Sequence, residues 1–311
     1  MKLVRLFVAS VFPKLVWVVG LIFIAPAPAL QAGNMSAAQI KQTQVNGINL
    51  TYQDQGQGTP VVFVPGALSD YRVWDAEREV VASRYRFIAL TQRYYGTGPW
   101  PDSGAKFSVA THADDLAAFI KGLNVGPVVL VGWSYSGQIV LLVAVQHPEL
   151  VRGVFIYEPA SLSYVTDSAD LKLATDDRKA MSAPGMAASK AGDNASAARL
   201  ILAGVNNQSN AFDSAPEAIR TMWLENDRTL PLGFAAPAPP KVTCQQLGQI
   251  KVPVTIARGE QTRPFYRISA ETAASCIPGA KLVVLPKDRH LAPVQDPVVV
   301  SNELMKFLSA W

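Results

Sequence analysis

The feature that most constrains this chain is a run of small residues between two apolar segments. Residues 132–137 read G-W-S-Y-S-G; they directly follow the apolar run 128–131 and precede another at 139–145. A strand that turns sharply into a helix needs small residues on both sides of the turn, which holds a serine hydroxyl exposed on strained backbone. The pattern is G-x-S-x-G with Ser136 in the last small position. It predicts Ser134 as a nucleophile; the structural alternative is a buried junction with a chance serine.

The elements around this turn predict the fold class. Val45–Ile48 carries an Asn-Gly hairpin signal. Short apolar runs predict strands, and helical spacing predicts helices over 111–123 and near 298–308. The predicted strands are 61–64, 87–90, 128–131, 153–157, 252–257 and 281–285. Strands alternating with helices predict an α/β domain with a mostly parallel sheet covered by helices on both faces.

Residues from about 160 to 245 break this alternation. They are rich in Ala, Ser and Asp, with helical patterns near 198–203 and 219–224, and residues 231–240 hold four prolines, which predicts a linker. We therefore expect a core of residues 40–158 and 246–311, with 159–245 as a helical cap and linker. Such a cap would lie over the C-terminal edge of the sheet, where open α/β sheets bind ligands.

Residues 1–32 are expected to be a signal peptide. Lys2 and Arg5 precede an apolar stretch at 15–25, and small residues follow at 27–32. An uncleaved anchor is the alternative, although the apolar core is about half the roughly 20 residues that a spanning helix needs. With Lys14, these residues supply three of the chain's four net positive charges, so the rest carries +1 and no basic stripe that would favour nucleic acid.

Cleavage would place the protein in the periplasm or outside the cell, with no stable membrane span. In an oxidising compartment the only two cysteines, Cys244 and Cys276, could form a disulfide; two buried thiols are the alternative. The few and scattered cysteines and histidines make no metal-ligand set, and no phosphate-binding or dinucleotide motif is present. We therefore expect neither metal nor cofactor.

Four motifs in order resemble the α/β-hydrolase family over residues from about 45 to 311. They are the loop at 64–67, the Arg93–Gly96 loop, the serine turn at 132–137, and the 285–290 loop that ends in a histidine. The resemblance implies a serine hydrolase with a helical cap. It also implies an oxyanion hole built from the backbone N–H groups of Ala67 and Tyr135.

The chain departs from the family pattern at three positions. Pro65 stands where the family often has histidine, and Tyr94 stands at a usual glycine. Thr262 stands where the family usually places its acid, and a threonine cannot carry the negative charge that stabilises an imidazolium.

Of the three histidines, His290 is the expected general base, because it follows the last strand at the edge where the serine emerges. We expect His147 to end a helix and His112 to be a capping or surface residue. For the acid, Glu158 after the strand 153–157 is preferred. Glu260, or a serine–histidine pair with another acid or none, stays open, and Asp288 is expected to shape the loop.

The sequence thus predicts a hydrolase of small-molecule esters or related acyl compounds. Carbon–carbon bond hydrolysis and perhydrolysis use the same site, and a non-catalytic binding protein of the same fold is the alternative from another class. Several aromatic residues suggest an apolar pocket, although they could equally be core residues: Trp133, Tyr135, Tyr94, Tyr95 and the pair Met222-Trp223. The sequence gives neither the substrate nor the oligomeric state.

Overall fold

The computed structural model describes residues 37–310, and its centre is an eight-stranded sheet. The strand order is β1-β2-β4-β3-β5-β6-β7-β8, in which β1 and β2 are antiparallel to their neighbours and all other pairs are parallel. The strands are β1 Gln39–Val45, β2 Ile48–Gln55, β3 Pro60–Val64, β4 Arg86–Leu90, β5 Val128–Trp133, β6 Val151–Tyr157, β7 Val254–Gly259 and β8 Lys281–Leu285. The predicted α/β fold with a mostly parallel sheet is confirmed. The predicted signal peptide at 1–32 lies outside the described residues.

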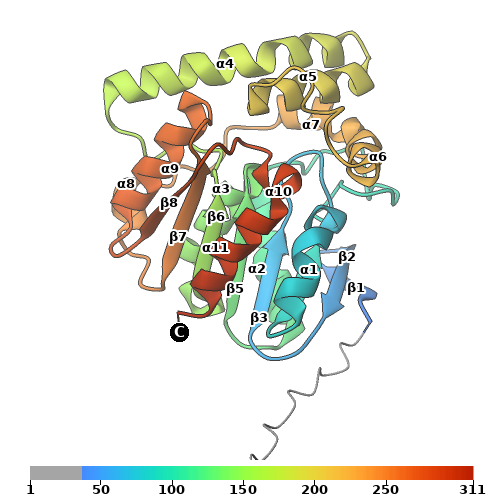
Figure 1. Cartoon of the computed structure of the whole chain (residues 1–311). Helices are drawn as coiled ribbons and strands as arrows, with labels where there is room; N and C mark the ends of the chain where they lie inside the picture. Colours follow the sequence, from blue (N-terminus) through green and yellow to red (C-terminus); the bar gives the residue numbers. More distant parts are fainter. Residues whose placement is uncertain (1–36, 311) are drawn as a thin grey trace, which may run out of the picture. The chain divides into compact units, whose positions relative to one another are not determined.

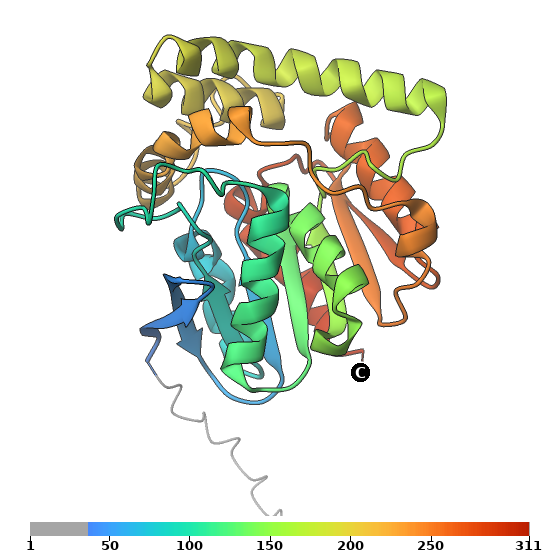
Figure 2. The same ribbon diagram turned by 180° about the vertical axis from the view of Figure 1, so that it is seen from behind.

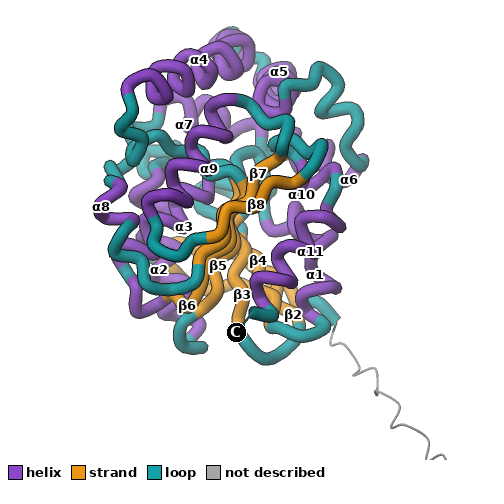
Figure 3. The backbone as a smooth tube through the Cα atoms, turned by 60° about the vertical axis from the view of Figure 1, so that its left-hand side comes forward, coloured by secondary structure: helices purple, strands orange, loops and turns teal. Residues whose placement is uncertain are grey.

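Helices cover both faces of the sheet (Figure 3). Helices α1 (Asp75–Ala82) and α11 (Pro297–Leu308) lie in front in Figure 1. Helices α2 (Val109–Leu123) and α3 (Tyr135–Gln146) lie on the opposite face, which Figure 2 brings forward. Helices α8 (Cys244–Leu247) and α9 (Pro264–Cys276) pack beside α3 and β7, respectively.

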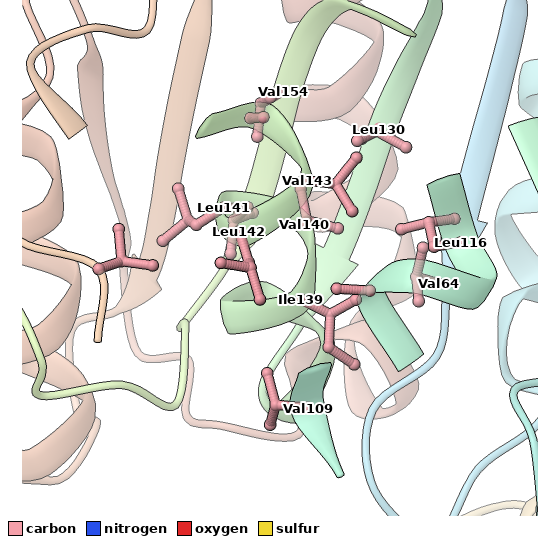
Figure 4. Close-up of a cluster of buried hydrophobic side chains, with 14 of the residues drawn as sticks. Val64, Val109, Leu116, Leu130, Ile139, Val140, Leu141, Leu142, Val143 and Val154 are labelled. Atoms are coloured by element: carbon pink, nitrogen blue, oxygen red, sulfur yellow. The ribbon is translucent and has the colours of Figure 1, made fainter. Parts of the chain in front are cut away.

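The central helix α3 is apolar nearly all round because it is buried between the sheet and its neighbouring helices. Val140 and Val143 lie against Leu130 and Val154 of the sheet, while Ile139 lies toward Leu116 of α2 (Figure 4). A helix without a polar face has to be buried. This packing fixes the start of α3, and with it the position of Ser134.

Four helices and their connections lie above the C-terminal ends of the parallel strands (Figure 1). They are α4 Ser168–Lys190, α5 Asn194–Asn206, α6 Glu217–Glu225 and α7 Leu230–Ala235. We call residues 159–243 the cap. The expected linker at 231–240 is partly wrong: Pro231 lies in the first turn of α7, where a missing N–H costs nothing. The irregular stretch begins only after Ala235.

Cys244, the first residue of α8, and Cys276, the last residue of α9, form a disulfide. The bridge joins the segment before β7 to the end of the helix after it. The prediction of a pair is therefore confirmed. No helix in residues 37–310 is long and apolar enough to span a bilayer.

One buried carboxyl generates a prediction about stability. Glu77 of α1 is fully buried, and neither of its carboxyl oxygens has a hydrogen-bond partner among the described residues. Burial raises its pKa well above the ordinary value of 4.5. The folded state therefore holds the proton on Glu77 at pH values where the unfolded state has lost it. As a result, the free energy of unfolding is highest below about pH 4.5 and falls as the pH rises toward the pKa of the folded state.

We expect Glu77→Met to raise the free energy of unfolding at pH 8 by about 1–3 kcal/mol, with a smaller gain at pH 4.5, because it removes an unpaired buried polar group. Urea unfolding at the two pH values measures this. The exposed Glu79 of the same helix provides the control, since Glu79→Met should change stability by less than about 0.5 kcal/mol. A Glu77→Met variant that is destabilised at pH 8 would contradict this prediction.

Candidate active site

The turn between β5 and α3 places Ser134 on strained backbone. Ser134 has φ 57° and ψ −117°, outside the regions that serine favours. The small neighbours are required by close packing: a Cβ on Gly137 would lie 2.7 Å from Pro159 Cα, and one on Gly132 would lie 3.0 Å from Val140 Cγ2. The turn therefore has the geometry of a nucleophile elbow.

Ser136 occupies the position that is usually glycine, and the structure explains why a serine fits. The residue is fully buried, and its Oγ accepts a hydrogen bond from the Trp133 N–H at 2.9 Å. The hydroxyl donates to the Val64 carbonyl at 2.7 Å. A satisfied hydroxyl costs little when buried, and this one joins the end of β5 to the end of β3.

Three side chains from separate strand ends form one hydrogen-bonded chain. His290 Nε2 lies 2.9 Å from Ser134 Oγ, and His290 Nδ1 lies 2.6 Å from Glu158 Oε2. His290 is 2% exposed and Glu158 is fully buried, whereas Ser134 is partly exposed. With Nδ1–H donating to the carboxylate, Nε2 is left to accept the serine proton. The structure thus brings together the three residues that the sequence pointed to.

Glu158 follows β6, and its carboxylate is held by donors from the β7 end. Its own backbone has φ 49°, and its N–H donates to the Ala257 carbonyl at 2.9 Å. The Gly259 N–H donates to Oε1 at 2.8 Å, and the Thr262 hydroxyl donates to Oε2 at 2.9 Å. Thr262 stands where the resemblance places an acid, and it binds the carboxylate that follows the neighbouring strand β6.

The other candidate carboxylates lie elsewhere. Glu260 Oε2 accepts a hydrogen bond from the Lys287 N–H at 2.9 Å, away from the imidazole. The Asp288 carboxylate makes no hydrogen bond or ion pair with His290. Burial raises its pKa to about 6, and the negative charges of Asp296 and Glu158 add to the shift. Its backbone carbonyl accepts from the Gln261 N–H at 2.9 Å, so Asp288 does shape the loop.

Two backbone N–H groups near the serine have no protein acceptor in residues 37–310. They belong to Tyr135, the first residue of α3, and to Ala67, in the loop after β3. Gly66 lets this loop approach the turn, since a Cβ there would lie only 3.3 Å from the Trp133 carbonyl oxygen. Unpaired N–H groups beside a serine are the arrangement that stabilises an oxyanion.

The expectation for His112 was wrong. His112 is 2% exposed within α2, and the helix is capped by Ser108 instead. Its Nδ1 lies 2.8 Å from the Tyr135 hydroxyl, and burial lowers its pKa to about 4, so it stays neutral. A neutral ring can accept from the phenol, which fixes the side chain next to the serine. His147 ends α3 as expected and lies 3.5 Å from Glu149.

The aromatic residues divide between core and cavity. Met222 and Trp223 are fully buried in the packing between cap and sheet, so the suggestion that they line a pocket was wrong. Tyr94 and Tyr95 line a cavity of about 630 Å³ beside the β1–β2 hairpin, which Ser134 does not line. Tyr94 has φ 72°, which explains why glycine is the usual residue there.

Sequence reasoning missed the residues that support the site. Tyr266 stacks on His290 with ring centroids 3.7 Å apart. Asn206, in the cap, accepts a hydrogen bond from the Leu291 N–H at 2.9 Å, next to the histidine. Both residues lie in helices of ordinary composition, and only the fold brings them to the site. No group of three or more metal-binding side chains occurs in the described part of the chain.

The comparisons with known proteins concern the family and the fold of the chain. Residues 61–303 match the model of the "Alpha/beta hydrolase family". A 2-(acetamidomethylene)succinate hydrolase from Mesorhizobium japonicum is 29% identical over 114 residues, which cover 37% of this chain and 40% of that protein. The match therefore spans less than half of the curated relative's length.

Two solved structures share the fold at low identity. An esterase from Rhodococcus sp. ECU1013 has a TM-score of 0.70 at 20% identity, covering 88% of this chain and 98% of that one. The enol-lactonase from Burkholderia xenovorans has a TM-score of 0.69 at 15% identity, and the match covers 86% of this chain and 100% of the lactonase chain.

A strained serine turn beneath a helical cap, at the C-terminal edge of a mostly parallel sheet, defines the class of this protein as a hydrolase. The family match covers well over half of the chain. The chain therefore belongs to the alpha/beta hydrolase family.

The hydrogen bond from Thr262 to Glu158 leads to a prediction. Thr262→Val removes one donor from a buried carboxylate at little change in shape, so we expect activity to fall about tenfold, whereas Thr262→Ser should retain most of it. Steady-state hydrolysis of a chromogenic ester measures the effect. Glu260→Gln is the matched control and should leave the rate unchanged, because the Glu260 carboxylate binds the Lys287 N–H and not the imidazole. Equal rates for Thr262→Val and wild type would show that the donor is dispensable.

Proposed function

We propose that this protein is a serine hydrolase that cleaves an ester or a related acyl compound through an acyl-enzyme intermediate. One observation carries the proposal: a continuous chain of hydrogen bonds runs from the buried Glu158 through His290 to Ser134. In this reading Ser134 is the nucleophile, His290 the general base and Glu158 the acid that orients the imidazole.

The reaction follows from the positions of these groups. His290 Nε2 takes the hydroxyl proton as Ser134 Oγ bonds to the substrate carbonyl carbon. The N–H groups of Ala67 and Tyr135 hold the oxyanion, and collapse releases the alcohol with the proton from His290. Water then attacks the acyl-enzyme, giving up its proton to His290, and Ser134 recovers a proton as the acid leaves.

The same site would support carbon–carbon bond hydrolysis or perhydrolysis, so the acyl substrate is proposed only as a small molecule. The solved neighbours include an esterase and an enol-lactonase, which support an ester or lactone as the first substrates to test. A non-catalytic binding protein is less well supported, because it would have no use for an oriented imidazole beside a strained serine.

Labelling with a fluorophosphonate tests the nucleophile. We expect wild type to be labelled and Ser134→Ala not at all, with Glu158→Gln slowed by about 10²–10⁴-fold. The exposed Ser103 supplies the control, because Ser103→Ala should be labelled like wild type. Adding Thr262→Asp to Glu158→Gln should restore part of the rate, since residue 262 already reaches the position of the acid. A folded wild type that fails to react would favour the binding protein.

We further propose that the protein is exported and that cleavage after Ala29 or Ala32 removes its N-terminal signal peptide. The Cys244–Cys276 disulfide supports this, because such bridges persist in oxidising compartments. Intact mass of protein expressed from the full-length sequence, measured in periplasmic, medium and membrane fractions, should show the shortened, oxidised chain outside the cytoplasm. A full-length chain in the membrane fraction would indicate an anchor instead, and a reduced full-length chain in the cytoplasm would contradict export.

A further inference from the structure

The two hydrogen bonds of His290 restrain the imidazole ring only against movement within its own plane. Glu158 and Ser134 hold the two ring nitrogens, and both contacts lie along the ring plane. Neither opposes movement of the ring perpendicular to that plane. A group packed on the flat face of the imidazole is needed to do so.

Tyr266 supplies that group. Its ring lies parallel to the imidazole, with centroids 3.7 Å apart and planes 16° from parallel. Tyr266 is 2% exposed and lies in the first turn of α9, just after Thr262. On another side, Trp133 lies 5.8 Å away at 42°, and its Nε1–H donates to the His290 carbonyl at 3.0 Å. The stacked tyrosine is thus the closest aromatic contact of the ring.

The cap holds Tyr266 in place. Asp177 of α4 accepts hydrogen bonds from the Arg263 guanidinium and, at 3.1 Å, from the Phe265 N–H. A carboxylate at a helix N-terminus is favourable because it binds free N–H groups there. Asp177 therefore holds the residues on both sides of Pro264, which are Arg263 and Phe265. Tyr266 follows in the same turn, and its side chain lies on the imidazole.

We propose that Tyr266 is a positioning residue, whose ring face holds the His290 imidazole in line between Glu158 and Ser134 and stabilises it when it becomes a cation. The inference rests on the proposed function of His290. An aromatic face attracts a cation lying over it, so the contact strengthens as the ring takes the serine proton. Burial raises the pKa of the Tyr266 phenol above its ordinary value, Glu158's charge adds to this, and a hydrogen bond with Ser134 opposes it, so the ring stays neutral.

The ring and the hydroxyl can be separated by substitution. Tyr266→Phe keeps the stacked face, and Tyr266→Leu removes it. Phe119→Leu is the matched control, because Phe119 is a fully buried aromatic residue of α2 that has no contact with His290. All variants would be compared as the full folded protein, with unfolding curves to confirm that each is folded at the assay temperature.

The first readout does not depend on activity. The chain has three histidines, so the His290 ring signals can be assigned with a His290→Ala variant. A stacked aromatic ring shifts the ring-proton resonances of its neighbour. We expect this shift to be kept in Tyr266→Phe and lost in Tyr266→Leu, while Phe119→Leu leaves it unchanged.

The second readout is the pH profile of fluorophosphonate labelling. We expect Tyr266→Leu to be labelled at least about tenfold more slowly at its optimum. We also expect the midpoint of its acid limb to move about half a unit to one unit lower, because the imidazolium loses the aromatic face. Glu158 is hydrogen-bonded to the imidazole, and Tyr266 is stacked on it. The Glu158 carboxylate is kept in Tyr266→Phe, Tyr266→Leu and Phe119→Leu.

Each outcome decides the inference. A labelled wild type, with Tyr266→Phe keeping the acid-limb midpoint and Tyr266→Leu slow and shifted, supports it. Wild-type rate and profile in Tyr266→Leu would overturn it, as would an equal shift in Phe119→Leu, which would indicate a general packing effect. A large loss in Tyr266→Phe would overturn the role of the ring face and assign it to the hydroxyl. Failure of wild type to react is a different result, since it removes the proposed function itself.

Discussion

The buried carboxylate of Glu158 is the constraint on which the rest of the site depends. A charged group with no exposure is costly unless donors surround it, and here three donors converge on it from two other strand ends. One is the N–H of Gly259, the last residue of β7, another is the Thr262 hydroxyl in the loop after β7, and the third is the imidazole that follows β8. The ends of β6, β7 and β8 must therefore keep their mutual register for the site to exist. This requirement also explains why Glu158 tolerates a positive φ.

The cap also helps to position the site, because its side chains bind backbone groups of the core. Three of its polar side chains bind core loops: Asp177 holds the start of α9, Asn206 holds the Leu291 N–H, and Asn226 accepts from the Gly96 N–H at 2.6 Å. Asn206 and Asn226 are almost fully buried, so losing either partner would leave an unpaired polar group. The first two bonds fix the backbone beside Tyr266 and His290. The cap thus does more than cover the strand ends, because it sets the loops that carry the site.

Much of the fold was predictable because its signals are local. The β5 run, the small residues of the turn and the apolar helix after it lie within one short segment, and each has a periodicity or size that only this junction satisfies. The opening hairpin is equally local, since Asn46 and Gly47 both take positive φ. The chain order of serine and histidine then allowed one histidine to be preferred over two others.

The remaining features depend on contacts that the sequence does not encode locally. His112 looked like an early helix residue open to solvent, but the loop before α2 folds Phe107 against it and buries its ring. Pro231 looked like a linker residue, although proline suits a first helical turn. Asn206, Asp177 and Tyr266 carry no motif, and their roles follow only from the distance between cap and core.

The position of the proposed acid, Glu158, shows how local sequence signals and sheet topology combine. In a parallel sheet the C-terminal ends of neighbouring strands lie side by side, and here Tyr157 of β6 pairs with Ala257 of β7. A carboxylate one residue beyond β6 can therefore reach the same imidazole nitrogen as one placed after β7. If both positions carried carboxylates, two like charges would face one ring and disfavour each other's ionised form. A threonine at 262 avoids this repulsion and donates a hydrogen bond to the remaining charge, so the threonine at 262 and the glutamate at 158 suit each other electrostatically.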